Sequence, residues 1–302
     1  MTQTIPSSGW RGWLAGAALL WSLFAVVWFA VAGLGSRFGL WSWQFGLGQM
    51  VGRVDAGYGR YIIYASATLA VLALVFALLR APRLRPTMLA AGAILITLFV
   101  GGRWFGFQLT ALSLPPIHQA ATDWEDPVLF STNLMSVREA AGADNPVEIN
   151  PVVELAEGFR EVWPGFHGKT VGQVQEDAEM DPELRGKDDE EKAYPPMNTV
   201  TTPLAKDEAF DVALALVEGR GWEVVGANHE AGRIEATQTS TWFGFKDDVA
   251  LRLRALDDGG TEIDMRSVSR VGLSDLGANA RRVSSFMYDL DRVLGETQRR
   301  AG

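Results

Sequence analysis

The sequence predicts an α+β protein in which N-terminal transmembrane helices precede a two-layer sandwich, an antiparallel four-stranded meander covered by helices. Three observations support this prediction. Residues 1–104 contain three long apolar runs without a charged side chain. Residues 222–271 contain four β-rich runs separated by short turns. Amphipathic helical patterns lie on either side of these runs, at 207–219 and 280–294.

The distribution of charge divides the chain into two expected domains. Residues 1–104 carry eight arginines, no lysine and one acid, a net charge of +7. Residues 105–302 carry 19 basic and 35 acidic side chains, a net charge of −16. A basic apolar half joined to an acidic half indicates a membrane anchor at 1–104 and a soluble α+β domain at 105–302. The acidic balance argues against nucleic acid as a partner, because binding it requires a basic surface.

Each apolar run is long enough to be a transmembrane helix. The runs cover about 13–34, 61–79 and 86–102, and about 17–25 helical residues cross a hydrocarbon core. The first run is longer than the core of a cleaved signal peptide, and residues 1–10 contain no basic side chain. No ionisable residue lies within any run, which favours an anchor over an ion or proton pathway.

The placement of arginines predicts how the anchor is oriented. Three arginines stand in the short loop 80–86, which therefore reads as cytoplasmic. Three more lie in the loop 35–60, but aromatic and apolar residues accompany them, so this loop can lie along the membrane interface. We therefore expect a multi-pass protein of the inner (cytoplasmic) membrane, with the lipid bilayer as partner and the C-terminal domain in the periplasm.

The region between the two domains offers little chemistry. His118 and Asp123 are secondary site candidates, but their spacing matches no known set of metal ligands. The alternative is that Asp123 caps a turn and His118 binds the backbone. Residues 153–163 have the pattern of a short amphipathic helix, and residues 176–192 hold nine acids and three basic residues. This acidic segment lacks the pattern of a calcium loop, so we expect a mobile solvated loop, no metal and no cofactor.

The last two predicted strands form a hairpin whose register can be tested. Leucines and valines of 248–256 alternate with arginines, so a shift by one residue would set leucines against acids. Two registers survive, with the numbers of opposing residues adding to 516 or to 518. The first places Arg252 opposite Asp264, and the second places Arg254 there. Both registers put a row of arginines and acids on the face opposite the core.

The soluble half resembles a known family through four motifs. They are PPIHQAATDWEDP (115–127), AYPPMNTVTTP (193–203), GWEVVGANHEAGRIEATQTSTWFGFKDDVALRLR (221–254) and DMRSVSRVGLSDLGANARR (264–282). The chain thereby resembles the uncharacterised bacterial and plastid family catalogued as domain of unknown function 1499. The resemblance implies a fold and a place in the cell envelope, because members often follow membrane spans or export signals. It implies no activity. An acid is expected after the histidine of the first motif, and this sequence has Gln119 instead.

The densest group of polar residues surrounds the hairpin and the start of the last helix. The ligand-binding candidates are Arg252, Arg266, Ser267, Ser269, Arg270, Asp275, Asn279 and Arg281, with Asp247 and Asp248 as further secondary candidates. Arginine side chains and helix N-terminal amides both suit phosphate or carboxylate groups. The sequence thus predicts a module that binds an anionic small ligand, a lipid headgroup or a membrane-protein partner. The alternative is that these arginines pair with the nearby acids in a structural network.

Two other classes of function remain open. A hydrolase would use a Ser/His/Asp-type site, with Ser267, Ser269 or Ser274 as nucleophile, His118 or His229 as base, and Asp123 or Asp275 orienting the base. The chain has no GxSxG motif and no complete catalytic constellation, so a non-enzymatic protein is the preferred interpretation. The third class is a scaffold subunit of a membrane complex, which sequence alone does not distinguish from a binding module.

Overall fold

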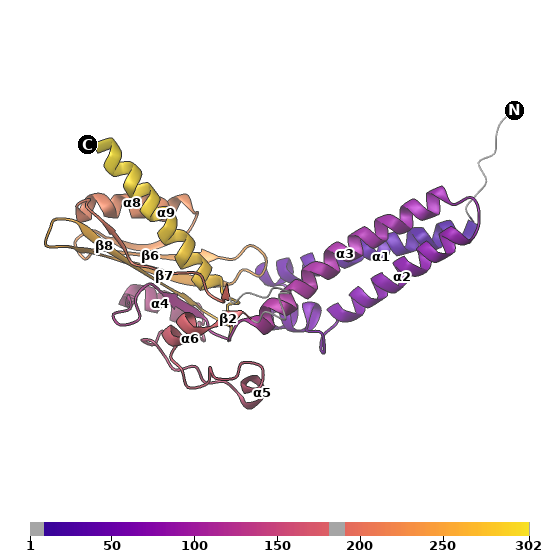
Figure 1. Ribbon diagram of the computed structural model, residues 1–302, viewed down its shortest axis with the longest axis horizontal. Helices are drawn as coiled ribbons and strands as arrows, with labels where there is room; N and C mark the ends of the chain where they lie inside the picture. The colour runs from indigo at the N-terminus through magenta and orange to yellow at the C-terminus, as the bar shows by residue number, and fades with distance from the viewer. Residues whose placement is uncertain (1–8, 181–190, 302) are drawn as a thin grey trace. The chain divides into compact units, whose positions relative to one another are not determined.

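The computed structural model describes residues 9–180 and 191–301 and divides into two compact units (Figure 1). The first unit comprises Met1–Leu109 with Thr241–Gly244, and the second comprises Thr110–Ser240 with Phe245–Gly302. Most of the acidic loop expected at 176–192 lies outside the described residues. Its described flanks form the short antiparallel pair β2 (Glu179–Met180) and β3 (Glu191–Lys192).

The first unit is built from three helices, α1 (Gly9–Arg37), α2 (Gly59–Leu79) and α3 (Leu84–Ser113). Each is long and apolar enough to cross a membrane, as the sequence predicts. Alanines fill one contact region between them: Ala15, Ala18, Ala70, Ala73, Ala90 and Ala93. Small side chains let the backbones of membrane helices approach closely. A hydrogen bond of 3.0 Å between the hydroxyls of Ser22 and Thr97 also joins α1 to α3.

The connection between α1 and α2 contains a π-helix, η1 (Gln44–Val51). Indole N–H groups from the long helices satisfy its last carbonyls: Trp28 donates to Met50 at 2.9 Å and Trp104 donates to Val51 at 3.1 Å. Irregular backbone within or beside a membrane needs such partners, because lipid offers none.

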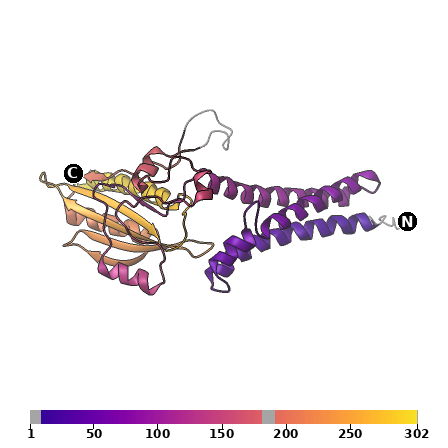
Figure 2. The same ribbon diagram turned by 90° about the horizontal axis from the view of Figure 1, so that it is seen from below.

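The second unit is an α+β domain around one six-stranded antiparallel sheet (Figures 1 and 2). Its meander consists of β5 (Glu223–Asn228), β6 (Arg233–Thr239), β7 (Lys246–Ala255) and β8 (Thr261–Ser269). These four strands confirm the predicted meander. Two strands were not predicted, β1 (Gln119–Ala121) and β4 (Val200–Thr202), and both pair with β8. Each has three residues, too few to show the period-two pattern of a strand.

The register of the hairpin is the first of the two expected. Arg252 lies opposite Asp264 and Arg254 lies opposite Glu262. One face of the sheet packs against α8 (Lys206–Gly219) and α9 (Ala278–Ala301), around buried Phe210, Leu251, Met265, Phe286 and Leu290. Part of the charged face is buried as well, at Asp248, Asp264, Arg266 and Arg270, with α4 (Thr132–Ala140) on that side of the sheet (Figure 1).

The segment after α4 is less helical than its sequence pattern suggests. Only α5 (Glu157–Arg160) forms within the expected helix at 153–163. The reason is that Val153 exchanges backbone hydrogen bonds with the 168–169 turn, its N–H reaching the Lys169 carbonyl at 2.8 Å. The next helix, α6 (Val171–Asp177), begins with a capping box between Thr170 and Gln173.

Candidate functional site

The hairpin acid Asp248 is enclosed by two arginines. Arg270 binds both of its carboxylate oxygens, with Nε at 2.8 Å and Nη2 at 2.7 Å. Arg138 of α4 donates to one of the same oxygens at 2.7 Å. All three side chains are buried, Asp248 completely. Burial of a carboxylate with two guanidinium groups leaves the cluster with a surplus positive charge.

A second cluster lies under the start of α9. Asn279 is fully buried, and its amide group donates to the hydroxyl of Ser269 at 2.8 Å and to the carbonyl of His118 at 3.0 Å. Its oxygen accepts from the hydroxyl of Ser267 at 2.6 Å. Asp275 accepts from the backbone N–H groups of Gly277 and Asn279, so Asp275 is the residue that caps the helix. Asn279 instead joins α9 to β8.

Asp247 of β7 joins this cluster through Arg282. Its carboxylate accepts a short hydrogen bond from Arg282, whose guanidinium also reaches the hydroxyl of Ser267 at 3.0 Å and the side-chain oxygen of Gln238 at 2.8 Å. Ser267, Ser269, Asp247 and Asn279 are therefore brought together, but the two serines bind Asn279 and the carboxylate of Asp247 binds Arg282.

A third group occupies the other end of the charged face. Arg252 binds Asp264 at 2.9 Å and Asp126 at 3.1 Å. Arg254 binds Asp126 at 2.7 Å and Glu262 at 2.6 Å. Two arginines thus share three acids. Asp123 takes no part in this group, since its carboxylate accepts from the backbone N–H groups of Glu125 and Asp126 and closes a turn.

Arg266 differs from Arg252, Arg254 and Arg270 because no carboxylate of the described residues pairs with it. Its side chain is 0% exposed, and its Nη2 donates to the side-chain oxygen of Gln119 at 2.6 Å. The guanidinium lies 5.9 Å from the ring centroids of both Trp124 and Phe130. Its Nε and the side-chain nitrogen of Gln119 have no hydrogen-bond partner in the part of the chain that the structure describes. Burial lowers the pKa of Arg266 to about 10, with Arg138 adding to the effect.

His118 lines a pocket of about 290 Å³ beside β1. Most of the wall is apolar and comes from the segments before β1, before α5 and at the start of α6; it includes Ile117, Val153, Leu155, Phe159, Val171 and Leu273. Glu148 and Glu154 are its exposed acidic members. The Nε2 atom of His118 is buried and has no hydrogen-bond partner within residues 9–180 and 191–301. Burial, then the charge of Arg138, lowers the pKa of His118.

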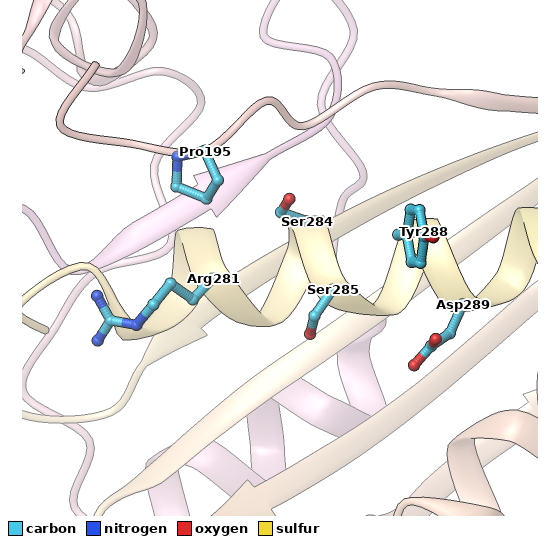
Figure 3. A pocket seen from close by; sticks show the side chains of 6 residues that line it. All are labelled: Pro195, Arg281, Ser284, Ser285, Tyr288 and Asp289. Atoms are coloured by element: carbon cyan, nitrogen blue, oxygen red, sulfur yellow. The ribbon is translucent and has the colours of Figure 1, made fainter. Parts of the chain in front are cut away.

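A second, more open hollow lies along the outer side of α9 (Figure 3). It is lined by Pro195, Arg281, Ser284, Ser285, Tyr288 and Asp289. Figure 3 shows Arg281 and Tyr288 at different turns of α9, so they do not converge on one point. Arg281 is exposed and makes no ion pair with a described residue. Asp289 and Ser285 are both bound by Arg220, which leaves little of this surface free.

No catalytic arrangement of serine and histidine appears among the described residues. His229 packs on the ring of Phe210 at 3.9 Å between centroids and lies 3.5 Å from Asp211. Ser274 accepts from the backbone N–H of Leu276. Neither histidine proposed as a base is hydrogen-bonded to a serine side chain. The part of the chain that the structure describes also contains no group of three or more histidines and acids placed to hold a metal ion.

The sequence missed two components of these sites. Arg138 lies 110 residues before Asp248, far from the hairpin on which the charged candidates were found. A signal for it exists, since Arg138 stands four residues after buried Leu134 and so shares the covered side of α4. The apolar wall of the His118 pocket gave no signal, because its segments have neither helical nor strand periodicity.

Comparison with protein-family models gives one match in the soluble half. Residues 121–290 match the model of a family described as protein of unknown function (DUF1499). This match covers more than half of the chain and confirms the resemblance drawn from the four motifs. A search of curated proteins finds no match to the sequence.

Proposed function

The chain belongs to the DUF1499 family of proteins of unknown function, and from that premise we propose that it is a membrane-anchored binding module. Its soluble domain binds a small, largely apolar molecule in the pocket beside β1. The observation that carries this proposal is the largely apolar wall of the pocket, which is joined by the partly buried ring of His118. Ligand sites commonly combine such walls with a few polar groups and a residue of shifted pKa.

The construction of the pocket supports the proposal, because its walls are fixed before any ligand arrives. The backbone N–H of Leu155 binds the ring of His167 at 3.1 Å, and that of Val153 binds the Lys169 carbonyl at 2.8 Å. On the opposite side, the Asp275 N–H binds the Ile117 carbonyl at 2.9 Å. A pre-formed cavity loses little conformational entropy on binding.

The volume of the pocket limits the size of the ligand that can bind in it. At about 30 Å³ for each non-hydrogen atom, the share of a water molecule in the liquid, a cavity of 290 Å³ holds on the order of ten such atoms. A substituted aromatic ring or a short acyl chain has this size. A whole lipid is larger, so a lipid ligand would place only one end here.

The proposed location is the inner membrane, with the soluble domain in the periplasm. Its support is the group of three arginines in the loop 80–86 between α2 and α3, which favours a cytoplasmic loop. The three apolar helices support attachment to a membrane.

A second candidate function is the binding of an anion, as the arginine-rich hairpin suggests. The observation that favours it is Arg266, a buried guanidinium without a carboxylate partner among the described residues. The remaining arginines of the charged face, Arg252, Arg254 and Arg270, already bind acids. The donors that would meet an anion there are Nε of Arg266 and the side-chain nitrogen of Gln119, which have no hydrogen-bond partner among the described residues.

The test of the main proposal uses small fluorinated probes of the size of the cavity. The full chain is placed in lipid nanodiscs, and the binding of 4-fluorobenzyl alcohol is followed through the fluorine resonance of the probe. The variant Ala156→Phe fills the pocket from its exposed wall and should weaken binding at least tenfold. The control Ala140→Phe adds the same ring at an exposed end of α4 that does not line the pocket. Equal binding by both variants would show that the probe enters the lipid and not the pocket.

A further inference from the structure

Arg103 of α3 is an exposed arginine at the end of the anchor that carries η1. It makes no hydrogen bond or ion pair with a residue that the structure describes. Two other arginines of this end are already engaged. Arg53 binds both carboxylate oxygens of Asp55, at 3.0 and 2.7 Å, and Arg60 donates to the Asp55 carbonyl and, at 2.8 Å, to the hydroxyl of Tyr61. The guanidinium of Arg103 therefore has all of its donors available.

Arg103 and Arg60 stand at the same height in the helix bundle. Arg103 lies 19 residues after the first residue of α3, and Arg60 lies 19 residues before the last residue of α2. At a rise of about 1.5 Å per residue, each stands roughly 28 Å from the turn between these helices, close to the thickness of a hydrocarbon core. Packing agrees, since a Cβ atom on Gly101 would lie 3.6 Å from Cγ2 of Ile63 in α2. Arg103 is therefore placed where hydrocarbon gives way to lipid headgroups.

The surface of α3 on the membrane side of Arg103 is apolar. Leu95 and Phe99 precede Arg103 by eight and four residues, so the three side chains follow one another along one side of the helix. Leu95 is 69% exposed and Phe99 is 66% exposed. Trp104 and Phe105 come directly after Arg103, and aromatic residues are typical of the membrane interface. One side of α3 thus passes from a surface suited to acyl chains to a cation at headgroup depth.

A guanidinium at this depth needs an anionic partner. Long basic side chains near the end of a membrane helix extend toward the interface, where lipid phosphates lie. The planar donors of arginine match two phosphate oxygens, which makes this pair strong. The protein itself offers no spare negative charge here, because Asp55 is the one acid within residues 1–104 and it pairs with Arg53. Arg60, at the same height, adds to the positive charge.

We propose that Arg103 binds the phosphate of an anionic phospholipid, one acyl chain of which lies along Leu95 and Phe99. The site distinguishes headgroups by charge. A zwitterionic headgroup brings its own cation, which competes with the guanidinium for the phosphate, whereas an anionic headgroup does not. This inference concerns the anchor alone and does not depend on the pocket beside β1.

The sequence contains no cysteine, so a single reporter can be placed beside Arg103. In Phe105→Cys an exposed position next to the site carries a fluorophore, and the full chain is placed in nanodiscs of phosphatidylcholine. A small, equal fraction of the lipid carries a nitroxide quencher on one acyl chain, with either a phosphatidylglycerol or a phosphatidylcholine headgroup. The ratio of quenching by the two lipids measures selection of the headgroup at this position. A second reporter, in Met88→Cys, reads an exposed position near the other end of α3.

We expect phosphatidylglycerol to be enriched about fivefold over phosphatidylcholine beside position 105, the factor that one arginine near a membrane surface supplies. Arg103→Gln should lower this enrichment to less than about twofold and leave the ratio at position 88 unchanged. Arg103→Lys keeps the charge and should keep part of the enrichment. Quenching by phosphatidylcholine should be the same in all variants, which shows that α3 keeps its depth.

Arg53→Gln is the matched control. It removes an equal charge from the same end of the anchor, but its guanidinium is already bound to Asp55, so the ratio at position 105 should change by less than about twofold.

Three results would overturn the proposal. Equal quenching by the two lipids in the chain with Arg103 would show that no headgroup is selected. If Arg53→Gln lowers the enrichment as much as Arg103→Gln does, the charge of the whole surface attracts the lipid and Arg103 forms no site. If inorganic phosphate abolishes the enrichment at an ionic strength where chloride does not, Arg103 binds a free phosphate ion and not a lipid.

Discussion

Gln119 and Arg266 meet where β1 joins the sheet, with Nη2 of the arginine donating to the side-chain oxygen of the glutamine at 2.6 Å. The guanidinium is fully buried, and its other acceptors are the backbone carbonyls of Val128 and Glu148. No carboxylate of the described residues neutralises it. A buried guanidinium held by neutral oxygens and two aromatic rings costs folding free energy, because the guanidinium loses its hydration without gaining an opposite charge.

The first prediction concerns Gln119→Glu. The sequence motif that begins at residue 115 is expected to carry an acid at this place, and the structure shows that such an acid would face Arg266. A charge-assisted hydrogen bond should raise the stability of the β1–β8 edge by about 1–2 kcal/mol. The measurement is hydrogen exchange of β8 amides in the full chain. The control Gln119→Met removes the acceptor and should lower protection; a loss of protection in Gln119→Glu would contradict the prediction.

The second prediction concerns the buried carboxylate between two arginines. Asp248→Asn leaves Arg138 and Arg270 without an opposite charge, so the variant should lose about 3–5 kcal/mol of stability. The loss is read from the exchange of β7 amides and from thermal unfolding. Asp126→Asn serves as the control, because Asp126 is 60% exposed and solvent screens its ion pairs, so this variant should lose far less stability. Similar losses in the two variants would show that burial does not set the strength of these pairs.

The alternation of residues along β7 and β8 predicts the core face and the charged face of the sheet, because each strand obeys a period of two. It does not decide between the two registers in which the numbers of opposing residues add to 516 or to 518, since both place arginines opposite acids. In the folded chain Asp248 lies opposite Val268, where it reaches both Arg270 and Arg138. Arg138 comes from another part of the chain. The sequence of the hairpin alone therefore does not show how many arginines pair with its acids.

Only part of the candidate site was predictable from the sequence, because the site also depends on segments that only the fold brings together. The polar residues that sequence brings forward do gather, but Ser267, Ser269 and Asn279 satisfy one another. His118 was a secondary candidate on its residue type alone. Its importance depends on an apolar wall built from Val153, Leu155 and other residues of irregular segments, which only the folded chain brings together.

The third prediction concerns pH and the N-terminal cap of α9. Burial raises the pKa of Asp275 to about 6, while hydrogen bonds from Asn279 and Gly277 oppose the shift. In the unfolded chain the pKa of an aspartate is about 3.9, so between roughly pH 4 and 6 the folded state binds more protons. The free energy of unfolding therefore falls as pH rises through this window, by at most about 3 kcal/mol.

Hydrogen exchange at the first turn of α9 measures this effect, after correction for the intrinsic dependence of exchange on pH. Protection at the Asn279 amide should decrease from pH 4 to pH 7 in the native chain. Asp275→Asn does not titrate and should give a flat profile. Protection that increases with pH would mean that the cap is favoured by the ionised form.

The fourth prediction concerns the contact between α6 and Trp124. A Cβ atom on Gly172 would lie 2.9 Å from the indole ring, which itself packs over Arg266 and donates to Gln175 at 2.6 Å. Gly172→Ala should therefore displace the ring and cost about 1–3 kcal/mol, although alanine is the better helix former. Gly158→Ala is the matched control, since Gly158 lies in α5 with no atom within 4 Å of the added Cβ. Tryptophan fluorescence and thermal unfolding compare the two variants, and equal stability would mean that the ring moves aside freely.

The last prediction concerns the orientation of the anchor. If the loop 80–86 is cytoplasmic, α3 crosses outward, and a reporter fused after Thr110 lies in the periplasm. Alkaline phosphatase should be active at this position, because it folds only where disulfides form. A fluorescent reporter restricted to the cytoplasm should be dark there and bright when fused within 80–86. Replacing Arg80, Arg83 and Arg85 together by glutamine should weaken this preference, because the competing arginines at 37, 53 and 60 then outnumber them. A bright cytoplasmic reporter after Thr110 in the native chain would place the His118 pocket in the cytoplasm and restrict its ligands to those of that compartment.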